Sequence, residues 1–302
     1  MTISQSHAQL DDPPGRDAPR AAYLRVYLTF VRNSLVRDLS YRSNFVIESV
    51  ASTSWVAMNL GFYLLIFNNP YVTQIGDGLG WGKYEFFVFL ATTMLVNNLV
   101  QIFFMPNAEE FSELIRTGRL DFALVKPIDT QFIISLQKIS WASISNFLVG
   151  VGLLGYSLWR LTTREINPLA ISPVAAILYP VYILLGVAIL YSLMITMSAA
   201  SVWLGRNQSL TNFWFYITNF SRYPMEIYNA GWGAALMYIF TFIVPVLVVV
   251  NVPARLLAQP LSPRAWWEWP LAGFAVLASV GSVLASRWVF QRAIKAYRSA
   301  SS

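Results

Sequence analysis

Long apolar stretches separated by short polar segments dominate the pattern along the chain. Six stretches without Asp, Glu, Lys or Arg meet or approach the about 20 residues that a helix needs to cross about 30 Å of hydrocarbon. They do not alternate apolar and polar residues, so helices rather than the strands of a closed barrel are expected to cross the membrane. The pattern therefore predicts an all-α integral membrane protein. Its six transmembrane helices are expected within residues 44–292, at about 44–67, 85–104, 139–160, 173–204, 232–252 and 267–290.

The fifth crossing has two candidates. Hydropathy favours residues 232–252, but the aromatic-rich segment 209–228 can also cross. In that case 232–252 becomes a re-entrant element, interrupted near Pro245 and Pro253. The pattern alone leaves both arrangements open.

The segments outside the spans differ in character. Residues 1–21 are polar and are predicted to form a disordered cytoplasmic tail, and residues 293–302 form a second cytoplasmic tail. Residues 22–43 carry arginines such as Arg25 and Arg32 on one face and leucines on another. This spacing predicts an amphipathic helix at the cytoplasmic interface, with its arginines toward lipid phosphates. A cytoplasmic extension of the first span is the alternative.

Lysine and arginine set the expected orientation. With the N-terminus inside and six crossings, 16 of these residues lie on the cytoplasmic side and 5 on the other side. If 209–228 is the fifth crossing, the numbers become 15 and 6, so the charge bias does not decide between the two arrangements. We expect a multi-pass protein of the inner (plasma) membrane with both termini in the cytoplasm.

The composition excludes an ordinary soluble protein. Of the 302 residues, 56% are hydrophobic and 12% are charged, whereas a soluble domain carries about 45–50% apolar and about 25% charged residues. Disorder of the bulk is excluded as well, because disorder needs low hydrophobicity and high charge. The net charge of +6 comes from scattered basic residues, so the expected partner is the lipid bilayer and not nucleic acid.

Reactive and metal-binding residues are scarce. The chain has no cysteine, and its one histidine, His7, lies in the polar tail. It contains no G-x-x-x-x-G-K-[ST] motif with which to cradle ATP phosphates, and no paired carboxylates within a span. We therefore expect the chain itself not to be an enzyme and to hold no metal and no cofactor.

Polar residues within the spans are few. Asn97, Asn98 and Gln101 in the second span and Asn146 in the third are candidates to line a translocation path. Hydrogen bonds between helices are the alternative use of such side chains.

The second cytoplasmic loop, residues 105–127, has the pattern of a short capped helix. Asn107 can cap its start, with Glu110 three residues later in a capping-box arrangement. Arg116 suits the last turn, and Gly118 can adopt the left-handed conformation that ends a helix.

The same predicted helix is amphipathic. Phe111, Leu114 and Ile115 form an apolar stripe, and Glu109 and Glu113 add negative charge near the helix start. Such a helix can present a face to a cytoplasmic partner. An ordinary interfacial loop helix fits the pattern equally well.

The run from Leu114 to Pro127 resembles the loop of a known family. Its sequence, LIRTGRLDFALVKP, is similar to the R-x-G-x-L-D-x-x-L-x-K-P loop of ABC-2 type transporter permeases, with Leu120, Asp121 and Lys126 among the matching positions. Weaker similarity extends over roughly residues 22–298.

The resemblance implies a six-helix transmembrane subunit of an ATP-binding cassette exporter with a cytoplasmic coupling helix. Such permeases work as homo- or heterodimers with separate ATPase subunits, which bind the ATP and Mg. It also favours the re-entrant version of the fifth region. By this resemblance the helix at 107–118 would dock on the ATPase. Its apolar anchors would be Phe111, Leu114 and Ile115, and its polar rim would be Glu109, Glu110, Glu113 and Arg116.

The substrate of such an exporter is not specified by the sequence, although aromatic and aliphatic walls suit an amphipathic cargo. Two other functions remain as alternatives. An ATP-independent channel or secondary carrier would transport without a partner, and a membrane scaffold would anchor a partner protein without transport.

Overall fold

The computed structural model describes residues 23–40, 42–72, 74–75, 81–204, 208–228, 231–259 and 268–301. Helices make up 83% of it, which confirms the predicted all-α class. A short antiparallel pair, β1 (Gln74–Ile75) and β2 (Trp81–Gly82), places Ile75 opposite Trp81. The predicted tail 1–21 lies outside the described residues.

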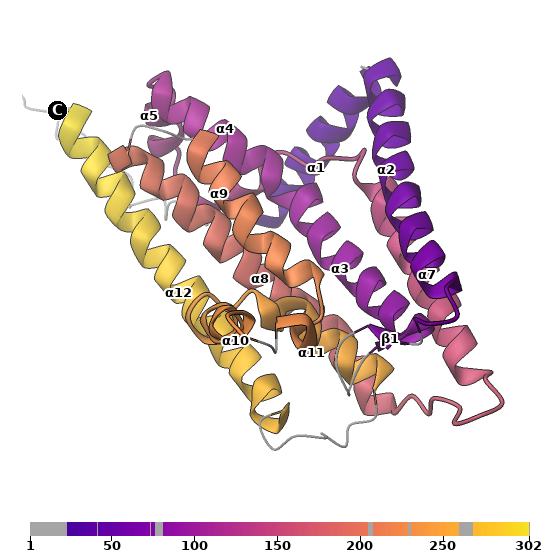
Figure 1. The fold of residues 1–302 in the computed structure, drawn as a ribbon. Helices are drawn as coiled ribbons and strands as arrows, with labels where there is room; N and C mark the ends of the chain where they lie inside the picture. Colours follow the sequence, from indigo (N-terminus) through magenta and orange to yellow (C-terminus); the bar gives the residue numbers. More distant parts are fainter. Residues whose placement is uncertain are drawn as a thin grey trace, which may run out of the picture.

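The helices follow the predicted order, and Figure 1 shows most of them running obliquely side by side. The α-helices are α1 (Tyr23–Ser40), α2 (Arg42–Asn68), α3 (Lys83–Phe103), α4 (Met105–Arg116), α5 (Leu120–Leu124), α6 (Thr130–Leu136), α7 (Ile144–Thr162), α8 (Pro173–Leu204), α9 (Gln208–Asn219), α10 (Gly233–Tyr238), α11 (Leu247–Ala258) and α12 (Glu268–Ser301). The 3-10 turns are η1 (Phe220–Arg222) and η2 (Met225–Tyr228), and η3 (Ile239–Ile243) is a π-helix.

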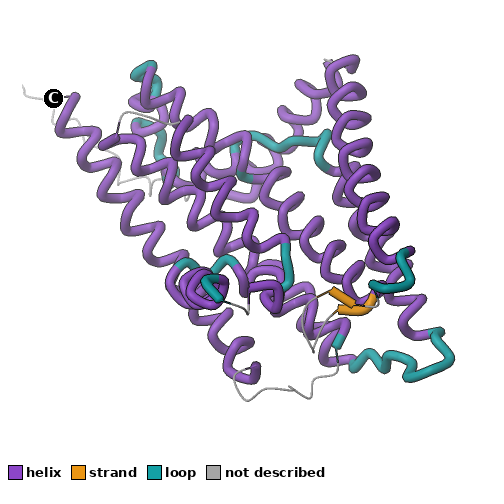
Figure 2. Tube along the Cα trace, in the orientation of Figure 1, coloured by secondary structure: helices purple, strands orange, loops and turns teal. Residues whose placement is uncertain are grey.

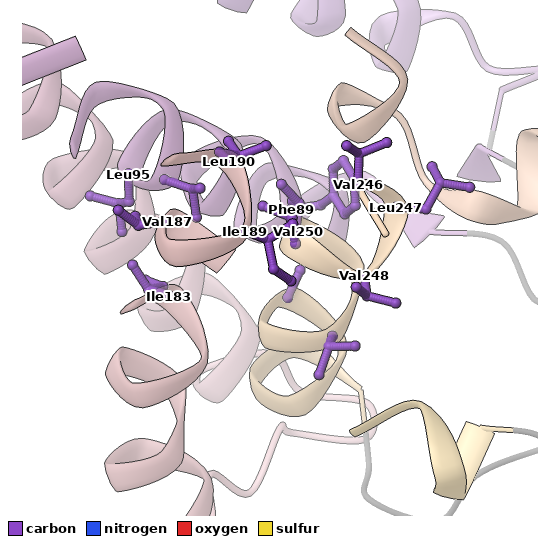
Figure 3. Close-up of a cluster of buried hydrophobic side chains, with 14 of the residues drawn as sticks. Phe89, Leu95, Ile183, Val187, Ile189, Leu190, Val246, Leu247, Val248 and Val250 are labelled. Carbon is purple, nitrogen blue, oxygen red and sulfur yellow. The ribbon is translucent and has the colours of Figure 1, made fainter. Parts of the chain in front are cut away.

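Within the described residues, α2, α3, α7, α8 and α12 are long and apolar enough to cross a membrane, and one bent helix pair raises the number of candidates from 5 to 6. This supports a multi-pass membrane protein. The core lies where α8 meets α3, α11 and α12. Figure 3 shows Phe89 of α3, Leu190 of α8 and Val250 of α11 packed together in it. In contrast, α2 has few buried residues.

The bent pair occupies the region of the ambiguous fifth crossing. The segment Gly233–Ile243 meets α11 at 89°, so residues 232–252 do not form one straight helix. In Figures 1 and 2, α10 and α11 lie toward the end of the molecule where the strands lie, whereas α9 runs along α8 from the opposite end. The Trp214 indole of α9 donates to the Leu190 carbonyl of α8 at 3.3 Å. The bent pair is compatible with a broken span or a re-entrant element, so both predicted arrangements of the fifth crossing stay open.

The first helix is tied to the stretch that precedes α7. Ser34 is buried, and its hydroxyl accepts from the Ile139 amide at 3.2 Å. The Asp38 carboxylate accepts from the Trp141 amide at 3.3 Å. Leu28 and other large apolar residues of α1 remain exposed. In Figure 1, α1 lies toward the same end of the molecule as the C-terminal end of α12.

A glycine permits the close approach of α8 and α11. A Cβ built at Gly186 would lie 2.7 Å from the Val249 carbonyl oxygen, which is backbone that cannot move aside cheaply. We expect Gly186→Ala to lower the free energy of unfolding by about 1–3 kcal/mol, measured as a lower melting temperature of the purified protein. Gly152→Ala in α7 is the matched control, because a Cβ there meets nothing within 4 Å. Equal melting temperatures of the two variants would contradict this account of the packing.

Candidate functional site: the segment from α4 to α6 and a polar cavity

The helix α4 begins earlier than its capping pattern predicts. Pro106 lies in its first turn, a position that proline favours, and Phe104 is the N-cap. The prediction that Asn107 caps this helix is therefore wrong. Asn107 is 2% exposed. Its side-chain nitrogen donates to the Lys138 carbonyl at 2.7 Å and to the Phe103 carbonyl at 2.8 Å, and its oxygen accepts from the Lys138 amide at 2.7 Å. Asn107 thus fastens α4 to the chain that leads into α7.

The apolar stripe of α4 faces the interior of the chain. Phe111 is 0% exposed, and its ring lies 5.7 Å from that of Phe290 in α12. Leu114 and Ile115 are half-buried against the same cluster, which includes Ile195 of α8. The prediction that Phe111 anchors a partner protein is not met in this structure, because α8 and α12 already cover the ring. The stripe joins the loop to two long helices.

The polar residues of α4 have separate surroundings. Glu110 forms an ion pair with Lys138 at 3.0 Å, a second link between α4 and the chain before α7. Glu109 is exposed, and Glu113 is half-buried and has an interaction partner. The backbone of Arg116 closes the helix, but its side chain lies outside the described part of the structure. Gly118 has φ +69°, so it takes the left-handed conformation predicted for it.

The motif that carries the family resemblance surrounds α5. Leu120 is fully buried, whereas Asp121, Lys126 and Pro127 are exposed. Two apolar residues between them were missed as functional candidates: Phe122 is 76% and Val125 is 84% exposed. Their signal in the sequence is the presence of large apolar side chains between charged residues in a loop. Among the described side chains, the exposed large apolar residues of this segment therefore lie in α5 and directly after it.

A charged cluster ties the next helix to α12. The Asp129 carboxylate caps α6 by accepting from the Phe132 amide at 3.0 Å. Arg287 of α12 pairs with Asp129 and also donates to the Gln131 side-chain oxygen at 2.8 Å. The hydrogen bond from Arg287, supported by the Phe132 amide and the guanidinium charge, lowers the pKa of Asp129 below its ordinary value of 3.8.

This lowered pKa predicts a pH dependence of stability. A depressed carboxyl pKa contributes stability that is fully present above about pH 4, the unfolded value, and is lost as the pH falls through the lower folded value. We expect the melting temperature of the wild type to exceed that of Asp129→Asn at pH 7. The difference between the two melting temperatures should narrow as the pH drops below 4. Melting curves between pH 3 and 7 measure it, with Glu109→Gln as an exposed control. A difference that stays constant would contradict the assignment.

A cavity of about 360 Å³ lies among α2, α3, the start of α7, and α9 with η1. The structure brings together here all four polar residues predicted to line a path, although Asn146 lies far from the others in sequence. The four residues are Asn97, Asn98, Gln101 and Asn146.

Few of these four polar side chains form hydrogen bonds within the described part of the protein. Asn97 donates to the Thr93 carbonyl of its own helix at 2.9 Å. The Asn146 side-chain oxygen is buried without a hydrogen-bond partner, and Asn98 and Gln101 form no side-chain hydrogen bond within the described chain. The alternative of hydrogen bonds between helices is therefore not observed for these four residues, and the side-chain amides of Asn98 and Gln101 have no partner among the described residues.

The remaining walls of the cavity combine aromatic, aliphatic and hydroxyl side chains with one charged residue. Trp55, Tyr63, Trp214 and Phe215 are among the aromatic residues that line the cavity. Arg222 is the only charged side chain among the described lining residues, with its guanidinium carbon 5.3 Å from the Phe215 ring centroid. The sequence drew attention to Arg222 as a topology marker and as part of the segment 220–228 that continues the family resemblance, but nothing in its local pattern placed it in a cavity with residues of α2 and α3.

Comparison with protein families decides the class. A model of the ABC-2 family transporter proteins matches residues 53–301, most of the chain. The chain belongs to the ABC-2 transporter family. Searches of curated proteins and of solved structures each found no match. The matched range contains both the segment from α4 to α6 and most of the cavity.

This ABC-2 permease is a membrane transport component and not itself a catalytic subunit. Within its described residues, no group of three or more His, Cys, Asp or Glu side chains is placed to hold a metal ion. Permeases of the family generally work with ATP-binding subunits.

Proposed function

We propose that this permease forms, with a second permease and two separate ATPase subunits, an ATP-driven export path for an amphipathic substrate. The second permease can be a copy of this chain or a different one. The ATPase subunits bind the ATP and Mg, and this chain contributes the path through the membrane. The chain lies in the inner (plasma) membrane with both termini in the cytoplasm, consistent with its excess of basic residues on that side.

The observation that carries the proposal is the two-sided character of the segment from α4 to α5. One side is fastened to the membrane helices, since Phe111 packs on α8 and α12 and Asn107 binds the chain before α7. The other side exposes Phe122 and Val125. Exposed apolar residues in a polar loop are typical of a protein contact. We assign this exposed face to the ATPase subunit.

The mechanism follows from these attachments. Closure of the two ATPase subunits on ATP moves α5, and the rigid connection through α4 passes this movement to α8, α12 and α7. The walls of the cavity belong to α2, α3, α7 and α9. A change in the relative tilt of these helices opens the cavity first to one side of the membrane and then to the other.

Purification of the tagged chain in mild detergent tests the proposal. We expect a copurified subunit with a G-x-x-x-x-G-K-[ST] motif, and we expect the eluate to hydrolyse ATP. Transport by the chain alone in liposomes without ATP would favour the channel or secondary carrier. Copurification of partners without ATP hydrolysis and without flux would favour the scaffold.

A further inference from the structure

The charge of Arg222 lacks a counterion in the part of the chain that the structure describes. No described carboxylate lies within ion-pair distance of it, and the titratable groups that act on it are the phenols of Tyr63 and Tyr223. Glu226 is the nearest acid in sequence, but it forms an ion pair with Arg255 of α11. A half-buried cation without a partner is costly, and an anion that binds beside it lowers this cost.

The surroundings of Arg222 indicate what else the anion must carry. The phenols of Tyr63 and Tyr223 lie close enough to act on the charge, and the amides of Asn98 and Gln101 line the same cavity further along α3. Trp55 and Trp214 offer aromatic surface to an apolar body. The volume of about 360 Å³ lies near the lower end of the about 300–1,000 Å³ of ligand pockets, so it suits a single-chain or small-ring compound and not a two-chain lipid.

We propose that this cavity binds monoanionic amphipaths, such as single-chain carboxylates, with Arg222 as the counterion of the anionic headgroup. The aromatic walls contact the apolar body. A cationic amphipath is disfavoured, because it would meet the Arg222 charge without a carboxylate on the described walls to balance it. This inference names the substrate class of the path and therefore rests on the proposed function.

Binding to the purified permease in nanodiscs tests the inference without any ATPase. The probes are radiolabelled dodecanoate, dodecan-1-ol and dodecylamine at pH 8, with binding to empty nanodiscs subtracted. We expect saturable binding of dodecanoate that is at least about tenfold tighter than binding of the alcohol, because a charge-assisted hydrogen bond is lost with the alcohol. Arg222→Gln should remove this preference for dodecanoate. Its affinity for the alcohol should stay within about threefold of the wild-type value, which also shows that the variant is folded.

A matched control removes another arginine that lies over aromatic rings. Arg160→Gln loses a guanidinium 5.0 Å from the Tyr84 ring, outside the cavity lining, and should bind dodecanoate like the wild type. The inference is wrong if Arg222→Gln binds dodecanoate as tightly as the wild type, if dodecylamine binds more tightly than dodecanoate, or if no probe binds saturably. Equal binding of carboxylate and alcohol, with both abolished by Asn146→Leu, would overturn the anionic class but keep the cavity as the path. The ATPase partner is tested separately by copurification.

Discussion

Replacing both Phe122 and Val125 by glutamate should abolish the ATP hydrolysis of the assembled transporter while the permease remains folded in the membrane. Both side chains are largely exposed, so the new charges enter water and no core is disturbed. Apolar residues at the centre of an interface each contribute about 2 kcal/mol or more to binding. Two charges in their place should weaken the contact with the ATPase at least about 100-fold.

Coupled ATP hydrolysis and copurification of the ATPase measure this effect. Ile166→Glu is the control, since Ile166 is 81% exposed and lies in the loop between α7 and α8, away from α5. The control should retain the partner and the activity. Full activity in the Phe122 and Val125 double variant would show that α5 is not part of the interface with the ATPase. Replacement of Phe111, in contrast, does not test docking, because this ring is buried and its loss disrupts the packing of α4 on α12.

Replacing Asn107 by leucine should loosen α4 from the chain before α7. Leucine keeps the branched shape of asparagine but is larger and cannot form hydrogen bonds, so it leaves the Lys138 amide and carbonyl unpaired in a buried place. Each unpaired buried group costs about 1–3 kcal/mol, so two of them should lower the free energy of unfolding by about 2–6 kcal/mol. We also expect faster hydrogen exchange at the Lys138 amide, together with loss of coupled ATP hydrolysis.

Asn59→Leu is the matched control for this second prediction. Among the described residues, the Asn59 side chain donates only to the Trp55 carbonyl of its own helix, at 2.9 Å. Its replacement should therefore change neither the melting temperature nor the hydrogen exchange near residue 138 appreciably. If Asn107→Leu behaves like this control, Asn107 does not hold α4 against the chain before α7. The movement of the ATPase must then reach α7 by another route.

The membrane helices were predictable because their length and apolarity are properties of the local sequence. The fourth predicted crossing, 173–204, coincides with α8 (Pro173–Leu204), and 44–67 lies within α2 (Arg42–Asn68). The bend between η3 and α11 was not decided by hydropathy, which measures composition and not direction. It depends on tertiary packing, such as the approach of Val249 to Gly186.

The site was only partly predictable, because it too depends on tertiary packing that the local sequence does not show. The amphipathic pattern identified the stripe of Phe111 but could not tell a partner protein from α12 as the surface that covers it. Asn107 fits a capping pattern, yet its partner Lys138 lies 31 residues away. Arg222 reaches the cavity lined by α2 and α3 only after α9 folds back along α8.

Crosslinking from position 122 tests most directly whether a separate motor acts on this permease through α5. The chain has no cysteine, so Phe122→Cys gives a single attachment point for a photoreactive maleimide, and Ile166→Cys gives the matched point in the loop between α7 and α8. Our account predicts that illumination of the complex joins position 122, and not position 166, to a subunit that carries an ATP-binding motif. Crosslinking of that subunit from position 166 instead, or labelling of position 122 only from outside the cell, would contradict it.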